Sequence, residues 1–198
     1  MLQKKLSLSV ILLFFFIISV AQMNEGNGSK IYLDDLFTGG TANMSFGENS
    51  STVGISPCFG ISLTKYVEVA VNVNINYATQ RNILYVGDKL RQKVFGPGAF
   101  IRLFPAKFLF FQAHYERNIM QTKYYGITNE SYSNSANSLL VGAGIASGKN
   151  YPEKKSYYYF SVLWDVLKSI NSPYLDNTHT PVPIIRAGYN ISLFNNRY

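Results

Sequence analysis

A chain of 198 residues is long enough for one domain with a sizeable core and too short for two comfortable ones. Its 18 Lys and Arg residues outnumber its 11 Asp and Glu residues, which gives a net charge of +7. No stretch clusters these basic residues on one face, and this argues against binding of nucleic acid. Cys58 is the only cysteine, so no internal disulfide is possible.

The first 21 residues are typical of a cleaved signal peptide. Lys4 and Lys5 precede an apolar run at residues 8–20, and residues 19–21 place small side chains where a signal peptidase cuts. A retained membrane helix is the competing interpretation, but residues 6–21 fall short of the ~20 that a spanning helix needs. We therefore expect residues 1–21 to be a signal peptide, residues 22–35 a polar linker and residues 36–198 one β-domain.

Eight apolar or alternating runs follow the linker. Residues 67–77, VEVAVNVNINY, show the pattern most clearly, because every odd position is a large apolar residue and the even positions are Glu68, Ala70 and three asparagines. A period of two fits a β-strand and no helix. The predicted strands are residues 37–47, 52–63, 66–80, 89–104, 107–124, 138–147, 156–169 and 182–194.

The connections between these runs alternate in length. Residues 64–65, 105–106 and 148–155 form the short set, whereas residues 81–88, 126–137 and 170–181 form the long set, with residues 48–51 as the exception. Tight turns at one end and longer loops at the other are typical of outer-membrane barrels. An even number of strands also permits closure with both termini on one side.

The composition of the polar faces indicates which side of the wall they occupy. These faces carry mainly Gly, Ser and Asn, whereas the outside of a water-soluble sheet normally carries Lys, Glu, Thr and Gln. Small residues fit the inside of a narrow eight-stranded barrel. We therefore expect the polar face of residues 67–77 to line the interior and its apolar face to meet lipid.

Aromatic residues near the strand ends support the same orientation. Interfacial girdles of aromatic residues are typical of membrane barrels. On this basis Tyr66, Phe104, Phe108 and residues 157–160 are predicted at the periplasmic interface, and Tyr77 and Tyr124 at the outer one. Parity also directs four aromatic side chains into the lumen: Phe100, Phe110, Tyr157 and Tyr159.

Five runs carry a resemblance to a known family: FTGGTANMSFG, ISPCFGISLTKYVEVAVNV, VFGPGAFIRLF, LLVGAGIASG and PIIRAGYNISLF. Together they resemble the small outer-membrane β-barrel domain proteins of Gram-negative bacteria, which are similar in architecture to OmpA and OmpX. The resemblance implies an all-β, eight-stranded, antiparallel up-and-down transmembrane β-barrel in the cell outer membrane, surrounded by outer-membrane lipid. It also implies insertion by the barrel-assembly machinery through a C-terminal aromatic residue, either Tyr198 or Phe194.

Three patterns suggest chemistry, and each has a simpler explanation. The run GAGIASGK at residues 142–149 misses the phosphate-loop spacing. His179 and Asp176 are too few ligands for a metal site. His114 is the most enzyme-like residue, because outer-membrane lipid A deacylases and palmitoyl transferases use barrel histidines, but parity places it in the interior, away from lipid. We expect no enzymatic activity, no cofactor and no metal.

Ionisable residues on the inward faces form the candidate site. Buried charges without partners cost several kcal/mol, so we expect these groups to pair and to plug the lumen. The predicted network consists of Glu68, Arg102, His114, Glu116, Asp165 and Arg186. The leading hypothesis is a monomeric barrel with a structural or surface-interaction role through its external loops. The alternatives are an outer-membrane lipid-modifying enzyme and a soluble, secreted, lipocalin-like binding barrel.

Overall fold

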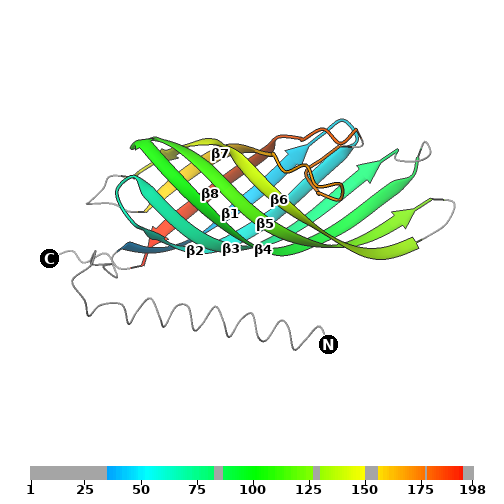
Figure 1. The fold of residues 1–198 in the computed structure, drawn as a ribbon, viewed down its shortest axis with the longest axis horizontal. Helices are drawn as coiled ribbons and strands as arrows, with labels where there is room; N and C mark the ends of the chain where they lie inside the picture. Colours follow the sequence, from blue (N-terminus) through cyan, green and yellow to red (C-terminus); the bar gives the residue numbers. More distant parts are fainter. Residues whose placement is uncertain (1–34, 83–86, 127–129, 150–155, 177, 194–198) are drawn as a thin grey trace, which may run out of the picture.

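The structure, a computed structural model, describes residues 35–82, 87–126, 130–149, 156–176 and 178–193. The expected signal peptide, almost all of the linker, and the terminal aromatics Phe194 and Tyr198 lie outside these residues. Within the described part of the chain, no helix is long and apolar enough to cross a membrane. Eight strands make up the fold (Figure 1): β1 Leu36–Phe46, β2 Ser50–Ser62, β3 Val67–Arg81, β4 Lys89–Ala106, β5 Leu109–Tyr125, β6 Glu130–Ser147, β7 Tyr157–Asp165 and β8 Ile184–Ser192.

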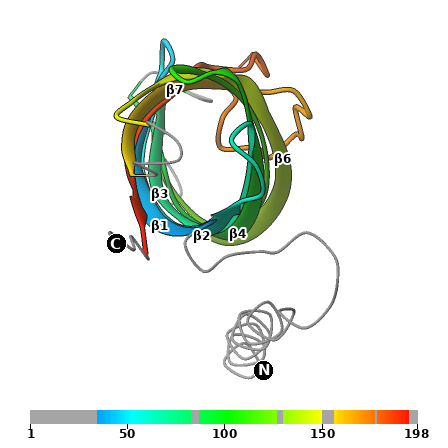
Figure 2. The same ribbon diagram turned by 90° about the vertical axis from the view of Figure 1, so that its left-hand side faces the viewer.

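The strands form one closed antiparallel barrel. Each strand pairs with its neighbours in chain order, and β8 closes the ring against β1, from Phe37 opposite Ser192 to Ser45 opposite Ile184. Figure 2, a view along the barrel, shows the continuous ring of strands. Closure leaves no sheet edge along the shared part of the wall. The predicted eight-stranded up-and-down topology is confirmed.

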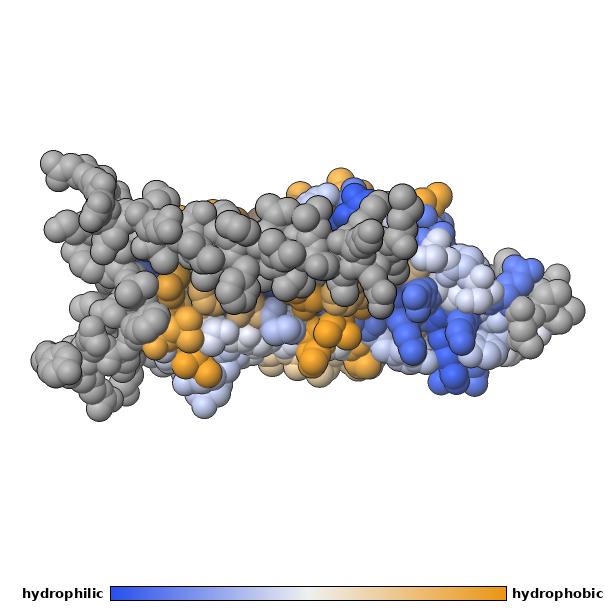
Figure 3. Space-filling model, turned by 90° about the horizontal axis from the view of Figure 1, so that it is seen from below, coloured by the Kyte–Doolittle hydropathy of each residue, from blue (hydrophilic) through white to orange (hydrophobic). Residues whose placement is uncertain are grey.

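The polar face of strand β3 points into the barrel. Asn72, Asn74 and Asn76 are buried in the lumen, with Asn74 fully inaccessible, whereas Ile75 and Tyr77 on the other face are 48% and 40% exposed. Apolar residues cover the middle of the outer wall, coloured orange in Figure 3. Because a water-soluble barrel would hide these side chains inside, the exposed apolar face is the arrangement of a barrel surrounded by lipid.

The strands of the barrel differ in length. β4, β5 and β6 contain 18, 17 and 18 residues, but β7 and β8 contain only nine each. β6 pairs with β5 from Glu130 onward, yet its pairing with β7 begins only at Leu140. The ends of β3 to β6 therefore project beyond the rest of the barrel, as the right-hand side of Figure 1 shows. We call this part the outer extension; it comprises residues 77–81, 89–94, 120–125 and 130–137.

Two predicted boundaries are wrong because of this asymmetry. The sequence predicts a loop at residues 126–137, but most of these residues belong to β6. Their Ser and Asn side chains suit a loop, and they equally suit a strand that lies in water and is held extended by hydrogen bonds to β5. Conversely, the strand predicted at residues 156–169 ends at Asp165, and Val166 and Leu167 beyond it are exposed.

The short connections lie together at the opposite end. In the β2–β3 turn, the amides of Thr64 and Val67 each donate to the other residue's carbonyl, at 3.2 and 3.3 Å. Residues 107–108 join β4 to β5. Gly148, after β6, has a φ of +94°, a conformation that favours glycine. This end of the barrel therefore has tight turns, as predicted for residues 64–65, while the β4–β5 turn lies two residues later than the predicted 105–106.

The four aromatic residues predicted in the lumen lie there, but among those predicted at the membrane interfaces Phe104, Tyr124, Tyr157 and Tyr159 point inward. Phe100, Phe110, Tyr157 and Tyr159 are buried in the lumen, and Tyr66, Phe108 and Tyr77 are exposed on the outside. Phe104, however, is only 2% exposed and packs inside against Phe110 and Tyr157. Tyr124 also points inward, where its hydroxyl donates to Asp88 at 2.9 Å. Both lie at even positions, and even positions of β4 and β5 face the lumen.

Candidate functional site

The polar interior of the barrel is the candidate site. All six residues of the predicted charge network face the lumen and are at most 2% exposed. The structure does not bring them into one network; it divides them among three groups of contacts. These groups lie near the tight turns, near the middle of the barrel and near the β7–β8 connection.

The turn-end cluster consists of Glu68, Arg102, Lys149 and Tyr157. The carboxylate of Glu68 accepts a hydrogen bond from the Lys149 ammonium at 2.6 Å and another from the Tyr157 hydroxyl. The Tyr157 oxygen in turn accepts from Nη1 of Arg102 at 3.1 Å. Glu68 and Arg102 are cross-strand partners on β3 and β4, and Tyr157 of β7 bridges them across the lumen.

Aromatic rings surround the guanidinium of Arg102. Its Cζ lies 3.9 Å from the ring centroid of Tyr159, 4.5 Å from that of Phe100 and 5.1 Å from that of Phe110. Its Nε donates to Gln112 at 2.9 Å. Cation–π contacts are strongest where the cation is desolvated, so the rings stabilise a charge that water does not reach. This cluster fills the turn end of the lumen with side chains.

Lys149 is a functional residue that the sequence reasoning missed. It follows β6 in a connection that was assigned simply as a turn, yet it is buried and its ammonium lies 3.2 Å from the ring centroid of Phe104. A signal was available in the inward charges. Three carboxylates faced two guanidiniums, so the third carboxylate needed a further cation, a charged His114, or neutral donors such as those that surround Asp165.

The central cluster consists of His114, Glu116, Tyr174 and Arg186. Nη2 of Arg186 lies 2.5 Å from Oε1 of Glu116, an ion pair between β8 and β5 on opposite sides of the ring. The hydroxyl of Tyr174 donates to the other oxygen of Glu116 at 2.7 Å and accepts from Asn76 at 3.0 Å. Tyr174 was missed by the sequence reasoning because it lies in a connection that was predicted to be external.

The hydrogen bonds of His114 define its charge. Nδ1 contacts Nη1 of Arg186, and a guanidinium has only donors, so this ring nitrogen is the acceptor. Nε2 then carries the proton and donates to Asn72 at 2.8 Å. The imidazole is therefore neutral with both nitrogens occupied. Nδ1 also lies 3.3 Å from Oε1 of Glu116, so His114 stands beside a carboxylate of the predicted network.

Asp165 holds a backbone segment instead of pairing with a base. Its carboxylate accepts hydrogen bonds from the backbone amides of Leu139 and Leu167, both at 3.1 Å, and from the Ser172 hydroxyl at 2.6 Å. Leu167 and Ser172 belong to the β7–β8 connection. Asp165 thus fixes the start of that connection against the barrel wall.

We call residues 166–176 and 178–183 the mouth segment, and its residues 172–175 fold back over the lumen. Tyr174 and Leu175 are 1% and 3% exposed, and the amide of Val182 donates to the carbonyl of Tyr174 at 3.0 Å. Tyr174 packs with Leu140, Leu163 and Ile184. The segment, orange in Figure 1, lies at the end of the barrel away from the β2–β3 turn. The long connection predicted at residues 170–181 thus lies at the end opposite the tight turns, but the burial of Tyr174 and Leu175 in the lumen was not predicted.

The asparagines of β3 connect the clusters. Asn72 bonds to His114, and Asn76 bonds to Tyr174 and to Asn43 of β1, the latter at 2.5 Å. Asn74 accepts from Asn72 at 2.8 Å and from Ser56 at 2.6 Å. Amides supply both donors and acceptors, so these side chains bond to one another, although Nδ2 of Asn74 has no partner among the described residues. The polar face of VEVAVNVNINY therefore forms the middle of the interior hydrogen-bond network.

The remaining sequence motifs do not form sites among the described residues. No three His, Cys, Asp or Glu side chains come together there as a metal-binding set. His179 has a positive φ of 59° in the mouth segment, and Asp176 bonds to Thr178 and Thr180. At Gly144, in the GAGIASGK run, an added Cβ would collide with Cζ of Phe110 and with the carbonyl of Phe160. This glycine makes room for an interior aromatic ring.

A closed eight-stranded antiparallel barrel with an apolar outside and a polar inside is the fold of the small outer-membrane β-barrels. Among solved structures, the chain is similar to Ail, the attachment invasion locus protein of Yersinia pestis, with 15% identity, a TM-score of 0.44, and coverage of 79% of this chain and 96% of that one. It is also similar to the N-terminal barrel of Pseudomonas aeruginosa OprF, with 11% identity, a TM-score of 0.43 and coverage of 79% and 96%. A third similar structure is Neisserial surface protein A, with 12% identity, a TM-score of 0.42 and coverage of 80% and 97%. No family model and no curated protein matches the sequence.

Proposed function

We propose that this protein is a monomeric outer-membrane barrel with a structural or surface-interaction role and without enzymatic activity. One observation carries the proposal: the outer wall exposes a band of large apolar side chains, while asparagines and charges face inward. Lipid is the solvent that suits such an outside. Insertion by the barrel-assembly machinery and contact with outer-membrane lipid follow from this location.

We further propose that the lumen is closed to solutes. The turn-end cluster, the central cluster and the mouth segment occupy successive levels of the interior, and eight strands leave only enough space for side chains. The neutral His114, bonded on both nitrogens, is not placed to act as a base toward lipid. These contacts favour a structural interior over a catalytic or conducting one.

Cell fractionation and gel migration test the location. The full-length protein should be recovered in the outer-membrane fraction, and after folding in detergent it should migrate differently before and after boiling. Recovery in the soluble periplasm, with the same migration under both conditions, would support the lipocalin-like alternative.

Two further measurements test the closed and non-catalytic interior. Planar bilayers containing the protein should show no long-lived, reproducible conductance. Mass spectrometry of outer-membrane lipids should find the same acyl composition with and without the protein. A lipid change that is abolished by His114→Gln would instead support a lipid-modifying enzyme, and stable conductance would support a passive channel.

A further inference from the structure

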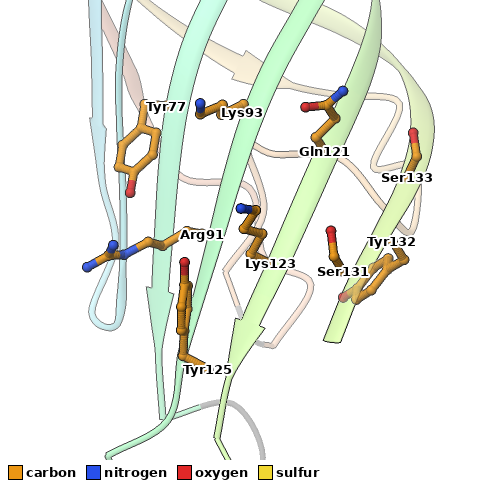
Figure 4. A pocket seen from close by; sticks show the side chains of 9 residues that line it. All are labelled: Tyr77, Arg91, Lys93, Gln121, Lys123, Tyr125, Ser131, Tyr132 and Ser133. Atoms are coloured by element: carbon orange, nitrogen blue, oxygen red, sulfur yellow. The ribbon is translucent and has the colours of Figure 1, made fainter. Parts of the chain in front are cut away.

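A basic and aromatic pocket lies on the outside of the outer extension. It has a volume of about 650 Å³ and is built from β3, β4, β5 and β6. Figure 4 shows Lys93 and Lys123 on neighbouring strands, with the ring of Tyr125 beside Arg91. The residues on which the argument depends are Tyr77, Arg91, Lys93, Lys123 and Tyr125.

The pocket directly follows the apolar band of the outer wall. Ile75, Phe95 and Ile119 are adjacent across β3, β4 and β5, and all three are exposed on the outside. Two residues further along the strands, the same face changes to Tyr77 and Lys93. A step of two residues along a tilted strand is about 5 Å in height. Figure 3 shows the corresponding change from orange to deep blue residues.

The arrangement of positive charges in the pocket favours the binding of an anion. Arg91 and Lys123 are direct cross-strand partners on the same exposed face, and like charges in this position destabilise a sheet. Lys93 is two residues from Arg91 on β4, and the described residues that line the pocket include no Asp or Glu. The guanidinium of Arg91 lies 5.2 Å from the ring centroid of Tyr125, which fixes its position without neutralising it. A bound anion would turn this repulsion into attraction.

We infer that this pocket binds the phosphorylated sugar headgroup of an outer-leaflet glycolipid. Guanidinium and ammonium groups recognise phosphate, tyrosine rings pack against the faces of sugars, and Gln121, Ser131 and Ser133 offer hydrogen bonds to sugar hydroxyls. The pocket opens sideways from the wall and adjoins Phe95 and Ile119, so the acyl chains of the same molecule can lie along the apolar band. This position favours a lipid over a soluble polyanion. The inference rests on the proposed outer-membrane location.

Lipid retention by the intact barrel tests the inference. The full-length protein is inserted into phosphatidylcholine vesicles that contain a bis-phosphorylated or a dephosphorylated glucosamine-based glycolipid, then extracted with mild detergent and analysed by native mass spectrometry. The wild type should retain the phosphorylated glycolipid in preference to the dephosphorylated one. The variant Arg91→Gln/Lys123→Gln should bind it about thirty-fold more weakly, since each basic group near an anionic lipid contributes roughly a factor of five.

A charge-matched control separates site binding from general attraction. Lys65→Gln/Lys107→Gln removes the same charge from the tight-turn end of the barrel and should retain the glycolipid like the wild type. Heat-modifiable migration of every variant establishes insertion first. If the wild type does not insert, the proposed location is wrong; if all variants insert and retain glycolipid equally, only this inference is wrong.

Two competition experiments distinguish a membrane glycolipid from a soluble anion as the ligand. Glucosamine 1-phosphate in solution should displace the glycolipid only weakly, because it lacks the acyl chains. Displacement at a concentration comparable to that of the glycolipid would overturn the assignment in favour of a soluble sugar phosphate. A sulfated polysaccharide that binds the wild type and not Arg91→Gln/Lys123→Gln, while glycolipid retention is unchanged, would overturn it in favour of a soluble polyanion.

Discussion

Side chains on the inner face and on the outer face of the barrel wall are stabilised in different ways. Inside, Asn76 of β3 bonds to Asn43 of β1 and to Tyr174 of the mouth segment, so side chains from distant parts of the chain hold one another. Outside, the adjacent Ile75 and Tyr77 are 48% and 40% exposed. A polar group inside therefore depends on its partners, whereas an apolar group outside depends on the surrounding lipid. The same substitution should have very different effects on the two faces.

The largest effect should come from breaking the ion pair of the central cluster. Arg186→Ala removes the guanidinium that lies 2.5 Å from Glu116, which is fully buried, and leaves an uncompensated carboxylate. We expect a loss of ~3 to 5 kcal/mol in the free energy of unfolding, because a buried charge without its partner is strongly unfavourable. Urea unfolding of the protein in detergent micelles or vesicles measures this.

A double substitution shows whether the orphaned charge is the cause. Arg186→Met/Glu116→Gln removes both charges, while the new amide side chain keeps an acceptor for the Tyr174 hydroxyl. It should cost much less than Arg186→Ala alone. If the loss in the free energy of unfolding of the double variant equals the sum of the losses for its two single substitutions, Arg186 contributes through packing and not through its pairing with Glu116.

On the outer face, a new charge should be the damaging change. Val71 lies on the apolar face of β3, near the expected midplane of the membrane, and Val71→Arg should cost ~2 to 4 kcal/mol. Its neighbour Asn72 faces inward, and Asn72→Ser keeps a small polar group there and should cost less. Unfolding in vesicles compares the two. Equal losses of stability for Val71→Arg and Asn72→Ser would mean that the inner and outer faces have been assigned the wrong way round.

Alternation predicted the common wall of the barrel well. In β3 and β8, large apolar residues occupy every second position, and one register shift would exchange the two faces, so the pattern determines the orientation. The short β2–β3 turn was predicted from Thr64 and Lys65 for a similar reason, since turn residues interrupt the alternation sharply. The alternation of residues is enough to predict the structure where the environment of each residue depends only on the side of the sheet it faces.

The parts that were not predicted depend on contacts between distant segments. The strand from Glu130 exists because β5 holds it, and its polar composition gives no sign of that. Tyr174 and Lys149 reach the lumen from connections, where no periodicity indicates direction. The sequence also counted His114 as a base, and only its position between Arg186 and Asn72 shows that the ring is neutral.

Lys149 offers an intermediate test of the interior. Lys149→Met keeps the length of the side chain but removes the ammonium 2.6 Å from Glu68. Glu68 still accepts from Tyr157, so we expect a loss of roughly 1.5 to 3 kcal/mol, the range for a hydrogen bond to a charged group. Lys65→Met, in the neighbouring exposed turn, should change stability by at most about 0.5 kcal/mol. Equal effects in urea unfolding would show that the buried ion pair has no net value.

The smallest effect should appear where the interior meets water, at Asp176 in the mouth segment. Hydrogen bonds from the hydroxyl of Thr178, and then from the backbone amides of Thr180 and Thr178, hold the pKa of Asp176 below its ordinary value of 3.8. A lowered carboxyl pKa means that the contribution to folding is complete above the ordinary value and is lost as the pH falls through the lower, folded-state value. The amide resonance of Thr180, followed by NMR in detergent micelles, should therefore titrate with a midpoint below 3.8, and Asp176→Asn should abolish the transition. A midpoint at or above 3.8 would mean that the carboxylate does not hold this turn in solution, and that the mouth segment depends on its other contacts, such as those of Tyr174 and Asp165.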